Sequence, residues 1–285
     1  MSATSLDESM MACLDIVRRL DHDRFLTALV APAERRAALI ALYAFNAEIA
    51  RVRETVSETM LGRIRLQWWR ETIDGIAKGD VRGHEAAVAL AETWTRETFP
   101  AARLVALIDA RERDLDDEPF EDMTALEAYG EGTSSGLMML AAMALDEDGN
   151  STATEAIRLA GIAYALTGLL RALPIHASQG RLYLPLDLLR RHDVDPHRIF
   201  AGEMSEGLRA IVNEIAGRAR TLLREARALG KVERNLLPAL LPASLCDRYL
   251  DLMTVPGFDP FREATEVPAF RRQMRLMSRK LTGRF

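Results

Sequence analysis

Helical periodicity runs through almost the whole chain, and it constrains the fold more than any other feature. Apolar residues recur every three to four positions in nearly every long segment, and the strict alternation typical of β-strands is almost absent. The pattern predicts one all-α domain over residues 1–285, with a first helix over 1–20. We expect further helices over about 33–56, 57–79, 84–98, 100–117, 124–145, 152–173, 204–229, 233–255 and 263–282.

Capping residues and helix breakers place the ends of these helices. Pro32 suits the first turn of a helix, and the longest loop is expected over 174–186, opened by Pro174 and containing Gly180 and Pro185. Side chains that cap a helix N-terminus are predicted at Ser57 and in two capping boxes, Thr124 with Glu127 and Thr152 with Glu155.

The composition is that of an ordinary globular protein, with 48% hydrophobic residues and a net charge of −5. This charge gives no general attraction for nucleic acid, and no apolar run approaches the roughly 20 residues of a membrane span. Cys13 and Cys246 lack the spacing of a metal or redox motif, which favours a reducing compartment. The acidic N-terminus resembles neither a signal nor a transit peptide. We therefore expect a cytoplasmic bacterial protein, either free or peripheral at the inner face of the membrane.

The C-terminal segment 268–285 is predicted to form a basic amphipathic helix. It contains six basic residues and no acidic residue, and Phe270, Met274, Met277 and Leu281 recur at helical spacing. Such a helix can lie on an anionic membrane surface. It can also pack its apolar residues against the protein and leave its arginines in solvent, and for a short terminal helix we expect packing.

Two charged segments carry carboxylates that need an interpretation. On a single helix over 33–56, Arg51 and Glu54 lie one turn apart on a face continued by Glu58, and this spacing favours a salt-bridged surface. Residues 109–117 contain several acids interrupted by Arg111 and Arg113. We interpret this second segment as a charged exposed turn.

Residues 169–185 read Leu-Leu-Arg-Ala-Leu-Pro-Ile-His-Ala-Ser-Gln-Gly-Arg-Leu-Tyr-Leu-Pro. This segment resembles the stretch with which squalene and phytoene synthases hold metal-bound diphosphate, Leu-Arg-Asp-x-x-x-Asp followed by Gly-Arg-x-Tyr-Leu-Pro. The ending is kept from Gly180 to Pro185, but Ala172 and His176 stand at the aspartate positions. Aligning Tyr43-Ala44-Phe45 with the other motif of that family places its acidic positions at Ala50, Arg51 and Glu54.

The resemblance covers most of the chain and implies a helical bundle of the isoprenoid-synthase type with a central cavity. It implies no metal, because Ala50, Arg51, Ala172 and His176 occupy the positions of the family's magnesium ligands. It also implies a ligand pocket that takes a prenyl diphosphate or a lipid and is formed by Tyr43, Arg51, Glu54, Tyr129, Ser135, Arg171, His176, Arg181 and Tyr183. Small residues from Gly132 to Gly136 suit either a lipid-shaped cavity or close helix packing.

The sequence is most similar to a divergent branch of the family, which contains a mitochondrial assembly factor for respiratory complex I. This likeness implies a non-catalytic protein whose partner is a complex I subunit or assembly intermediate. The alternative is an active prenyltransferase that joins two prenyl diphosphates head to head, with Mg²⁺ and with Glu48 and Glu54 as catalytic residues. A third possibility is a module that binds prenyl diphosphate or lipid without chemistry.

Overall fold

The computed structural model describes residues 3–95, 98–146 and 153–285, and within these ranges the protein is helical, without a β-strand. The predicted all-α class is confirmed. Contacts within the chain define two compact units, which are described separately. Unit 1 takes the described residues of Met1–Asp116, Gly136–Thr154 and Val232–Pro242, and unit 2 takes Asp117–Ser135, Glu155–Lys231 and Ala243–Phe285. The single-domain organisation stays a prediction.

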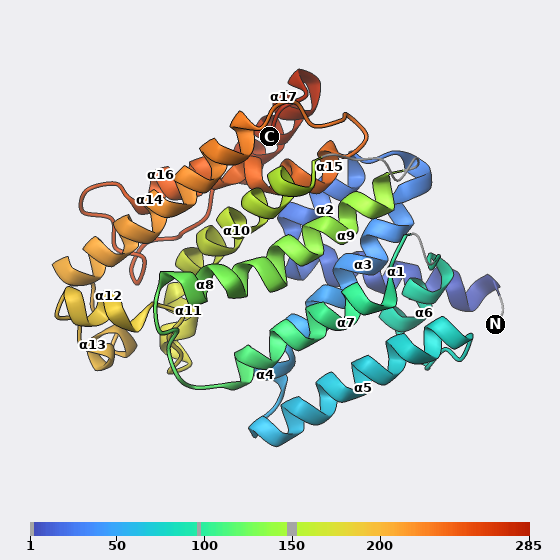
Figure 1. Cartoon of the computed structure of the whole chain (residues 1–285), viewed down its shortest axis with the longest axis horizontal. Coiled ribbons are helices and arrows are strands. Elements are labelled where there is room, and N and C mark those ends of the chain that lie inside the picture. Colours follow the sequence, from blue (N-terminus) through green and yellow to red (C-terminus); the bar gives the residue numbers. More distant parts are fainter. Residues whose placement is uncertain (1–2, 96–97, 147–152) are drawn as a thin grey trace. The chain divides into compact units, whose positions relative to one another are not determined.

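Unit 1 is built around the apolar helix α3, which contacts α1, α6 and α9 (Figure 1). Helix α5 packs along α7, and α9 is covered by α15. Large buried side chains such as Phe45, Leu66, Trp69 and Leu104 fill the space between these helices. The helices of this unit are α1 (Ala3–Leu20), α2 (His22–Leu29), α3 (Ala33–Ala50), α4 (Val52–Thr55), α5 (Thr59–Lys78), α6 (Glu85–Glu92), α7 (Ala101–Ala110), η1 (Arg111–Leu115), α9 (Gly136–Leu145) and α15 (Leu237–Leu240).

The predicted helix over 33–56 is interrupted. It starts after Pro32 as expected, but α3 ends at Ala50, and Arg51 leaves the helical conformation before the single turn of α4. The next helix begins after Glu58, whose side chain makes no capping hydrogen bond, so the prediction of Ser57 as the cap is wrong. Glu58 therefore does not share a helix with Arg51 and Glu54.

Unit 2 is built on the long amphipathic helix α14, which contacts α12 and α16, while α11 contacts α13 (Figure 1). Helix α14 begins at the cap Ser205 and buries its apolar face, including Ile211, Ile215 and Leu222. Its helices are α8 (Met123–Gly130), the π-helical turn η2 (Glu131–Ser135), α10 (Thr154–Arg171, from Glu155 on), α11 (Leu173–Ser178), α12 (Leu186–Arg191), α13 (Pro196–Phe200), α14 (Glu206–Ala228), η3 (Leu241–Leu245, from Ala243 on), α16 (Cys246–Met253) and α17 (Ala269–Thr282).

Two predictions of helix ends in unit 2 are wrong, and a third involves a residue that the structure does not describe. Asp122, not Thr124, caps α8 by accepting a hydrogen bond from the Ala125 amide. Pro174 lies in the first turn of α11 instead of opening a loop, because proline needs no hydrogen-bond partner there. The connecting loop is thus shorter than expected and starts beyond α11. The predicted capping pair of Thr152 and Glu155 lies partly outside the described residues.

The C-terminal helix α17 is oriented differently from the expectation. Arg272 and Leu276 are its buried residues, whereas Phe270, Met274, Met277 and Leu281 are exposed. The prediction that the apolar residues of this helix pack against the protein is therefore wrong. Across the described ranges, no helix combines the length and the apolar character needed to cross a bilayer.

Candidate ligand site

The break between α3 and α4 places Arg51 and Glu54 on one exposed turn of unit 1. Nε of Arg51 lies 3.7 Å from Oε2 of Glu54, and both side chains are 44% exposed. The ion pair expected from their spacing is confirmed. The guanidinium of Arg51 thus neutralises the carboxylate of Glu54.

Glu48 lies one turn before this break and has two cationic or polar neighbours. Its Oε2 lies 3.4 Å from Nη2 of Arg65 and 3.7 Å from Nε2 of His84, and its side chain is 16% exposed. Nδ1 of His84 accepts a hydrogen bond from the Ala86 amide, so a neutral ring carries its proton on Nε2, facing Glu48. The interaction with His84, followed by Arg65, lowers the pKa of Glu48. The carboxylate of Glu48 therefore has a structural role, in which it contacts Arg65 and His84.

We expect Glu48→Gln to lower the free energy of unfolding by about 1 kcal/mol at neutral pH. Folding lowers the pKa of Glu48. The stability that its ionised carboxylate contributes is therefore fully present above the pKa of the unfolded chain, about 4.3, and is lost as the pH falls through the lower pKa of the folded protein. Urea unfolding at a series of pH values should show the wild type and the variant converging in acid. Glu54→Gln, which alters an exposed pair, should change the free energy by less than about 0.5 kcal/mol. A Glu48→Gln deficit that persists unchanged to about pH 3 would contradict the assignment.

Tyr43 is part of the core of unit 1. Its side chain is 2% exposed, and the guanidinium of Arg24 lies 5.9 Å from the centre of its ring. Burial raises the pKa of Tyr43, and Arg24 partly offsets this effect. The hydroxyl stays protonated at neutral pH, so Tyr43 is not poised to act as a base.

Four aromatic side chains from separate segments meet in unit 2. The rings of His176 on α11 and Tyr183 in the following loop lie 4.4 Å apart, and Tyr129 on α8 lies 6.0 Å from Tyr183. Phe120 completes this aromatic cluster, 5.3 Å from Tyr129 and 6.1 Å from Tyr183. Three of the predicted pocket residues are therefore brought together, with Phe120 as a neighbour that the sequence motifs did not indicate.

The backbone fixes the loop that carries Tyr183. Gly180 has a positive φ of 67°, and the Arg181 amide donates to the His176 carbonyl over 2.9 Å, which closes α11. At the far end, the Leu186 amide donates to the Phe120 carbonyl over 2.7 Å. The Gly-Arg-x-Tyr-Leu-Pro sequence thus forms a turn attached to the segment before α8.

Arg171 makes a cation–π contact at the end of α10. Its guanidinium carbon lies 3.7 Å from the centre of the Tyr249 ring, which is 1% exposed, and its carbonyl accepts a hydrogen bond from Oγ1 of Thr265. This stacking orients the guanidinium and lowers the freedom of its side chain. The sequence did not predict Tyr249 as the partner of Arg171, because the two residues are far apart along the chain.

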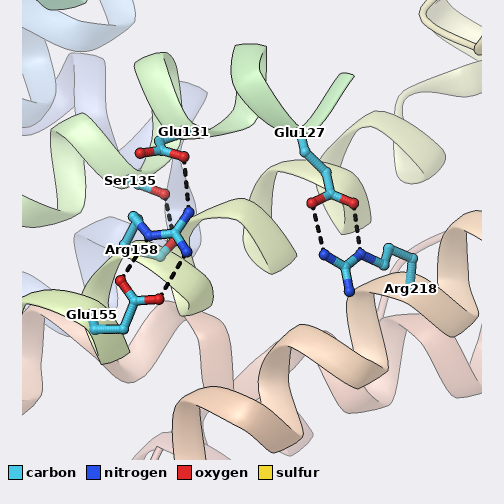
Figure 2. Close-up of polar contacts among 6 residues, drawn as sticks. All are labelled: Glu127, Glu131, Ser135, Glu155, Arg158 and Arg218. Carbon is cyan, nitrogen blue, oxygen red and sulfur yellow. Dashed lines mark hydrogen bonds and ion pairs between the residues drawn. The ribbon is translucent and has the colours of Figure 1, made fainter. Parts of the chain in front are cut away.

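The small residues of η2 serve close packing against α10. Ser135 is 4% exposed, and its hydroxyl donates to the Arg158 carbonyl over 2.6 Å. A Cβ atom added at Gly161 would overlap Cα and Oγ of Ser135. Figure 2 shows the guanidinium of Arg158 near Ser135, between Glu131 and Glu155, with both of which it pairs. Of the two predicted roles for this segment, the contacts of Ser135 correspond to helix packing.

A bidentate ion pair joins α8 to α14 in the same unit (Figure 2). Nε and Nη2 of Arg218 donate to the two carboxylate oxygens of Glu127 over 2.6 and 2.9 Å. Glu127 is thus used between helices and not in the capping box that its spacing from Thr124 predicted.

The acidic segment 109–117 is a structural connection in unit 1. Arg70 on α5 contacts both Asp109 and Glu112 over 2.7 Å, and this ties α5 to the end of α7. Asp114 lies 3.3 Å from Arg111 and is 7% exposed. The expectation of a charged exposed turn is therefore wrong at Asp114, which is buried.

The residues that the sequence resemblance places at magnesium positions do not fit a magnesium site. Ala172 offers no ligand atom, the ring of His176 packs against Tyr183, and Arg51 brings a cation beside Glu54. Magnesium prefers oxygen ligands in octahedral array. Within the described ranges, no cluster of three or more His, Cys, Asp or Glu residues is arranged to hold a metal ion.

Neither cysteine is a nucleophile at neutral pH. Cys13 in unit 1 and Cys246 in unit 2 are both 0% exposed. Burial raises the pKa of each thiol to about 12. Both thiols remain protonated and inaccessible to solvent.

With this geometry in place, comparison with known proteins identifies the class. The chain belongs to the squalene/phytoene synthase family, because the sequence model of that family matches residues 17–277. It is similar to complex I assembly factor 6 of Bos taurus, with 31% identity over 255 residues, which cover 89% of this chain and 76% of that protein. It is also similar to the 15-cis-phytoene synthase of Synechococcus elongatus, with 25% identity over 284 residues, covering 94% and 91% of the two chains.

A solved structure supports the fold over the whole chain. The crystal structure of a dehydrosqualene synthase in complex with ligand matches with a TM-score of 0.83 and 18% identity, covering 98% of each chain. At this identity the likeness establishes the fold alone. The chain therefore has the helical fold of the squalene-synthase-like proteins, as the resemblance implied.

Proposed function

We propose that this protein is a non-catalytic member of the squalene/phytoene synthase family that acts in the assembly of respiratory complex I. The proposal rests on the presence of Ala50, Arg51, Ala172 and His176 at the positions where the resemblance to the family places carboxylates. Departure of diphosphate requires neutralisation of the charge that develops on it, which magnesium supplies when carboxylates hold the ion. A guanidinium, a methyl group and an imidazole cannot hold magnesium in this way.

The proposed partner follows from the relatives. Those at 30–31% identity over 89% of the chain are named NADH dehydrogenase (ubiquinone) complex I, assembly factor 6, in Bos taurus and Homo sapiens. We propose that this chain likewise contacts a complex I subunit or assembly intermediate, from the cytoplasm. Arg181 and the aromatic cluster of Phe120, Tyr129, His176 and Tyr183 are proposed to hold a prenyl diphosphate or a lipid without metal.

The competing function is head-to-head prenyl transfer with Glu48 and Glu54 as catalytic carboxylates. The contacts of these residues weigh against it. Glu48 is engaged by Arg65 and His84, and Glu54 by Arg51. A carboxylate with a cationic partner must give up that partner before it can bind a metal or accept a proton, which makes both residues weak candidates.

We expect deletion of the gene to lower the amount and activity of assembled complex I and to leave the isoprenoid content unchanged. Native gels and NADH oxidation by membranes measure the first, and extraction of lipids measures the second. In vitro, farnesyl or geranylgeranyl diphosphate should raise the melting temperature equally with magnesium and with EDTA, without any product. A phytoene synthase serves as the positive control for turnover.

Two results would overturn the proposal. Release of diphosphate by the purified protein in the presence of magnesium would establish catalysis. Normal complex I together with lost isoprenoids in the deletion strain would assign the chain to isoprenoid synthesis instead.

A further inference from the structure

Helix α17 presents a narrow apolar stripe to solvent. Phe270, Met274, Met277 and Leu281 are 70%, 59%, 49% and 74% exposed. Their spacing of four, three and four residues aligns them along about 17 Å of one helix face. The opposite face is the packed one, with Arg272 and Leu276 buried. We call the four exposed residues the α17 stripe.

A groove of about 600 Å³ runs beside the stripe, between α16 and α17 within unit 2. Phe270 and Met274 belong both to the stripe and to the wall of the groove. The other lining residues combine three arginines, two acids and small or apolar side chains, namely Arg248, Arg271, Arg275, Asp251, Glu266, Leu252, Val267, Pro268 and Ser278.

The charges around the groove leave cations available. Arg275 is held by Asp247 over 2.7 Å, and the acid Asp251 is contacted by Arg220 over 3.3 Å. Arg248 and Arg271, in contrast, are exposed and make no ion pair with any described residue. Glu266 is the second acid of the groove, so its lining carries three arginines against two acids and a net positive charge next to exposed apolar side chains.

We propose that the α17 stripe and this groove form a docking surface for an anionic phospholipid membrane. The stripe enters the boundary between headgroups and acyl chains, and Arg248 and Arg271 contact lipid phosphates. A helix that exposes apolar residues on one side with flanking arginines lies in the plane of the interface. The arginines keep their charged ends at the headgroups while their stems cover the apolar boundary.

The charge distribution favours lipid over a second copy of the chain. A two-fold dimer would bring this surface of both subunits together, and in each subunit the groove carries three arginines against two acids, so two net positive surfaces would meet. The stripe is also only one side chain wide, which suits shallow insertion into a lipid interface. Anionic lipid compensates every exposed cation along the helix, including Arg284 at its end.

Sedimentation with lipid vesicles tests the proposal on the full chain. We expect binding to vesicles of phosphatidylcholine mixed with phosphatidylglycerol, weak binding to phosphatidylcholine alone, and release by salt. Phe270→Ser with Leu281→Ser should lower binding more than about tenfold. Arg248→Glu with Arg271→Glu should lower it by at least about tenfold.

Matched controls come from exposed positions of unit 1. Met60→Ser with Ile64→Ser removes two exposed apolar side chains from α5, and Arg63→Glu with Arg103→Glu reverses two exposed charges. These variants should bind as the wild type does. Equal losses in the controls, or no binding of the wild type to anionic vesicles, would overturn the proposal.

A fluorescent label reports whether the stripe itself enters the membrane. Both native thiols are 0% exposed, so Leu281→Cys offers a single reactive site for an environment-sensitive dye. We expect a blue shift on addition of anionic vesicles, and no shift for the same dye on Ile64→Cys. If the stripe variants instead abolish self-association of the free protein, measured by light scattering, the surface is a dimer interface and the proposal fails. None of these readouts depends on the role in complex I assembly.

Discussion

Gly161→Ala should lower the free energy of unfolding by about 3 kcal/mol or more. The new Cβ would overlap Cα and Oγ of Ser135 and would lie 2.8 Å from its Cβ. Because Cα of Ser135 belongs to the backbone of η2, the collision cannot be relieved by a rotamer change. Either α10 or η2 must shift, and the hydrogen bond from Ser135 to the Arg158 carbonyl is then lost. Chemical denaturation measures the effect.

The same helix provides the control for this prediction. Gly168 also lies in α10, but a Cβ there would meet no atom within 4 Å. Gly168→Ala should therefore raise stability by about 0.5–1 kcal/mol through its higher helix propensity. Adding Ser135→Gly to Gly161→Ala should restore only part of the loss, since Cα remains. Equal stability of the two alanine variants would show that η2 does not pack closely on α10.

Asp247→Asn should lower the free energy of unfolding by about 2–3 kcal/mol. Asp247 on α16 receives two hydrogen bonds from Arg227 of α14, over 3.1 and 3.0 Å, and one from Arg275 of α17, over 2.7 Å. All three side chains are less than a third exposed. Burial, and then the charges of Arg275 and Arg227, lower the pKa of Arg279, which shows that cations are crowded here. Without the carboxylate, α17 should separate first, and hydrogen exchange along 269–282 should rise.

Asp74→Asn is the matched control. Asp74 pairs with Lys78 over 2.6 Å, but the two side chains are 64% and 69% exposed. We expect a change below about 0.5 kcal/mol, because an exposed pair on one helix contributes little. If Asp247→Asn lowers the free energy of unfolding as little as Asp74→Asn does, solvent alone stabilises the arginines around Asp247, and the prediction is wrong.

Helix periodicity predicted the class of fold and most of the helices, but several ends were wrong. A capping box forms only if its polar side chains are available to the free amides at the start of the helix. A contact with another helix can engage the same side chain instead. Glu127 was expected to cap α8 with Thr124, yet it pairs with Arg218 of α14, and Asp122 provides the cap. The break at Arg51 carries no proline or glycine, so local sequence had no signal for it.

The candidate site was predictable only where its residues are close in sequence. Arg51 and Glu54 are one turn apart, and their ion pair follows from that spacing. The contacts of Tyr129 with Tyr183 and of Arg171 with Tyr249 join segments that are distant in sequence, and they required the fold. Ser135 was assigned equally to a cavity and to packing, and only the proximity of Gly161 distinguishes the two.

Helix α17 shows most clearly which features follow from the sequence and which depend on the tertiary structure. The sequence by itself determined that the segment 268–285 contains a helix with an apolar stripe and a basic remainder, because side chains three and four apart share a face. Only the tertiary structure decided which face is packed. Asp247 draws Arg275 inward beside the buried Arg272 and Leu276, and the stripe is left facing solvent. The half-buried carboxylate of Asp247 binds arginines from two other helices, and this interaction outweighs the tendency of four apolar side chains to leave water. No pattern within α17 shows where that carboxylate lies.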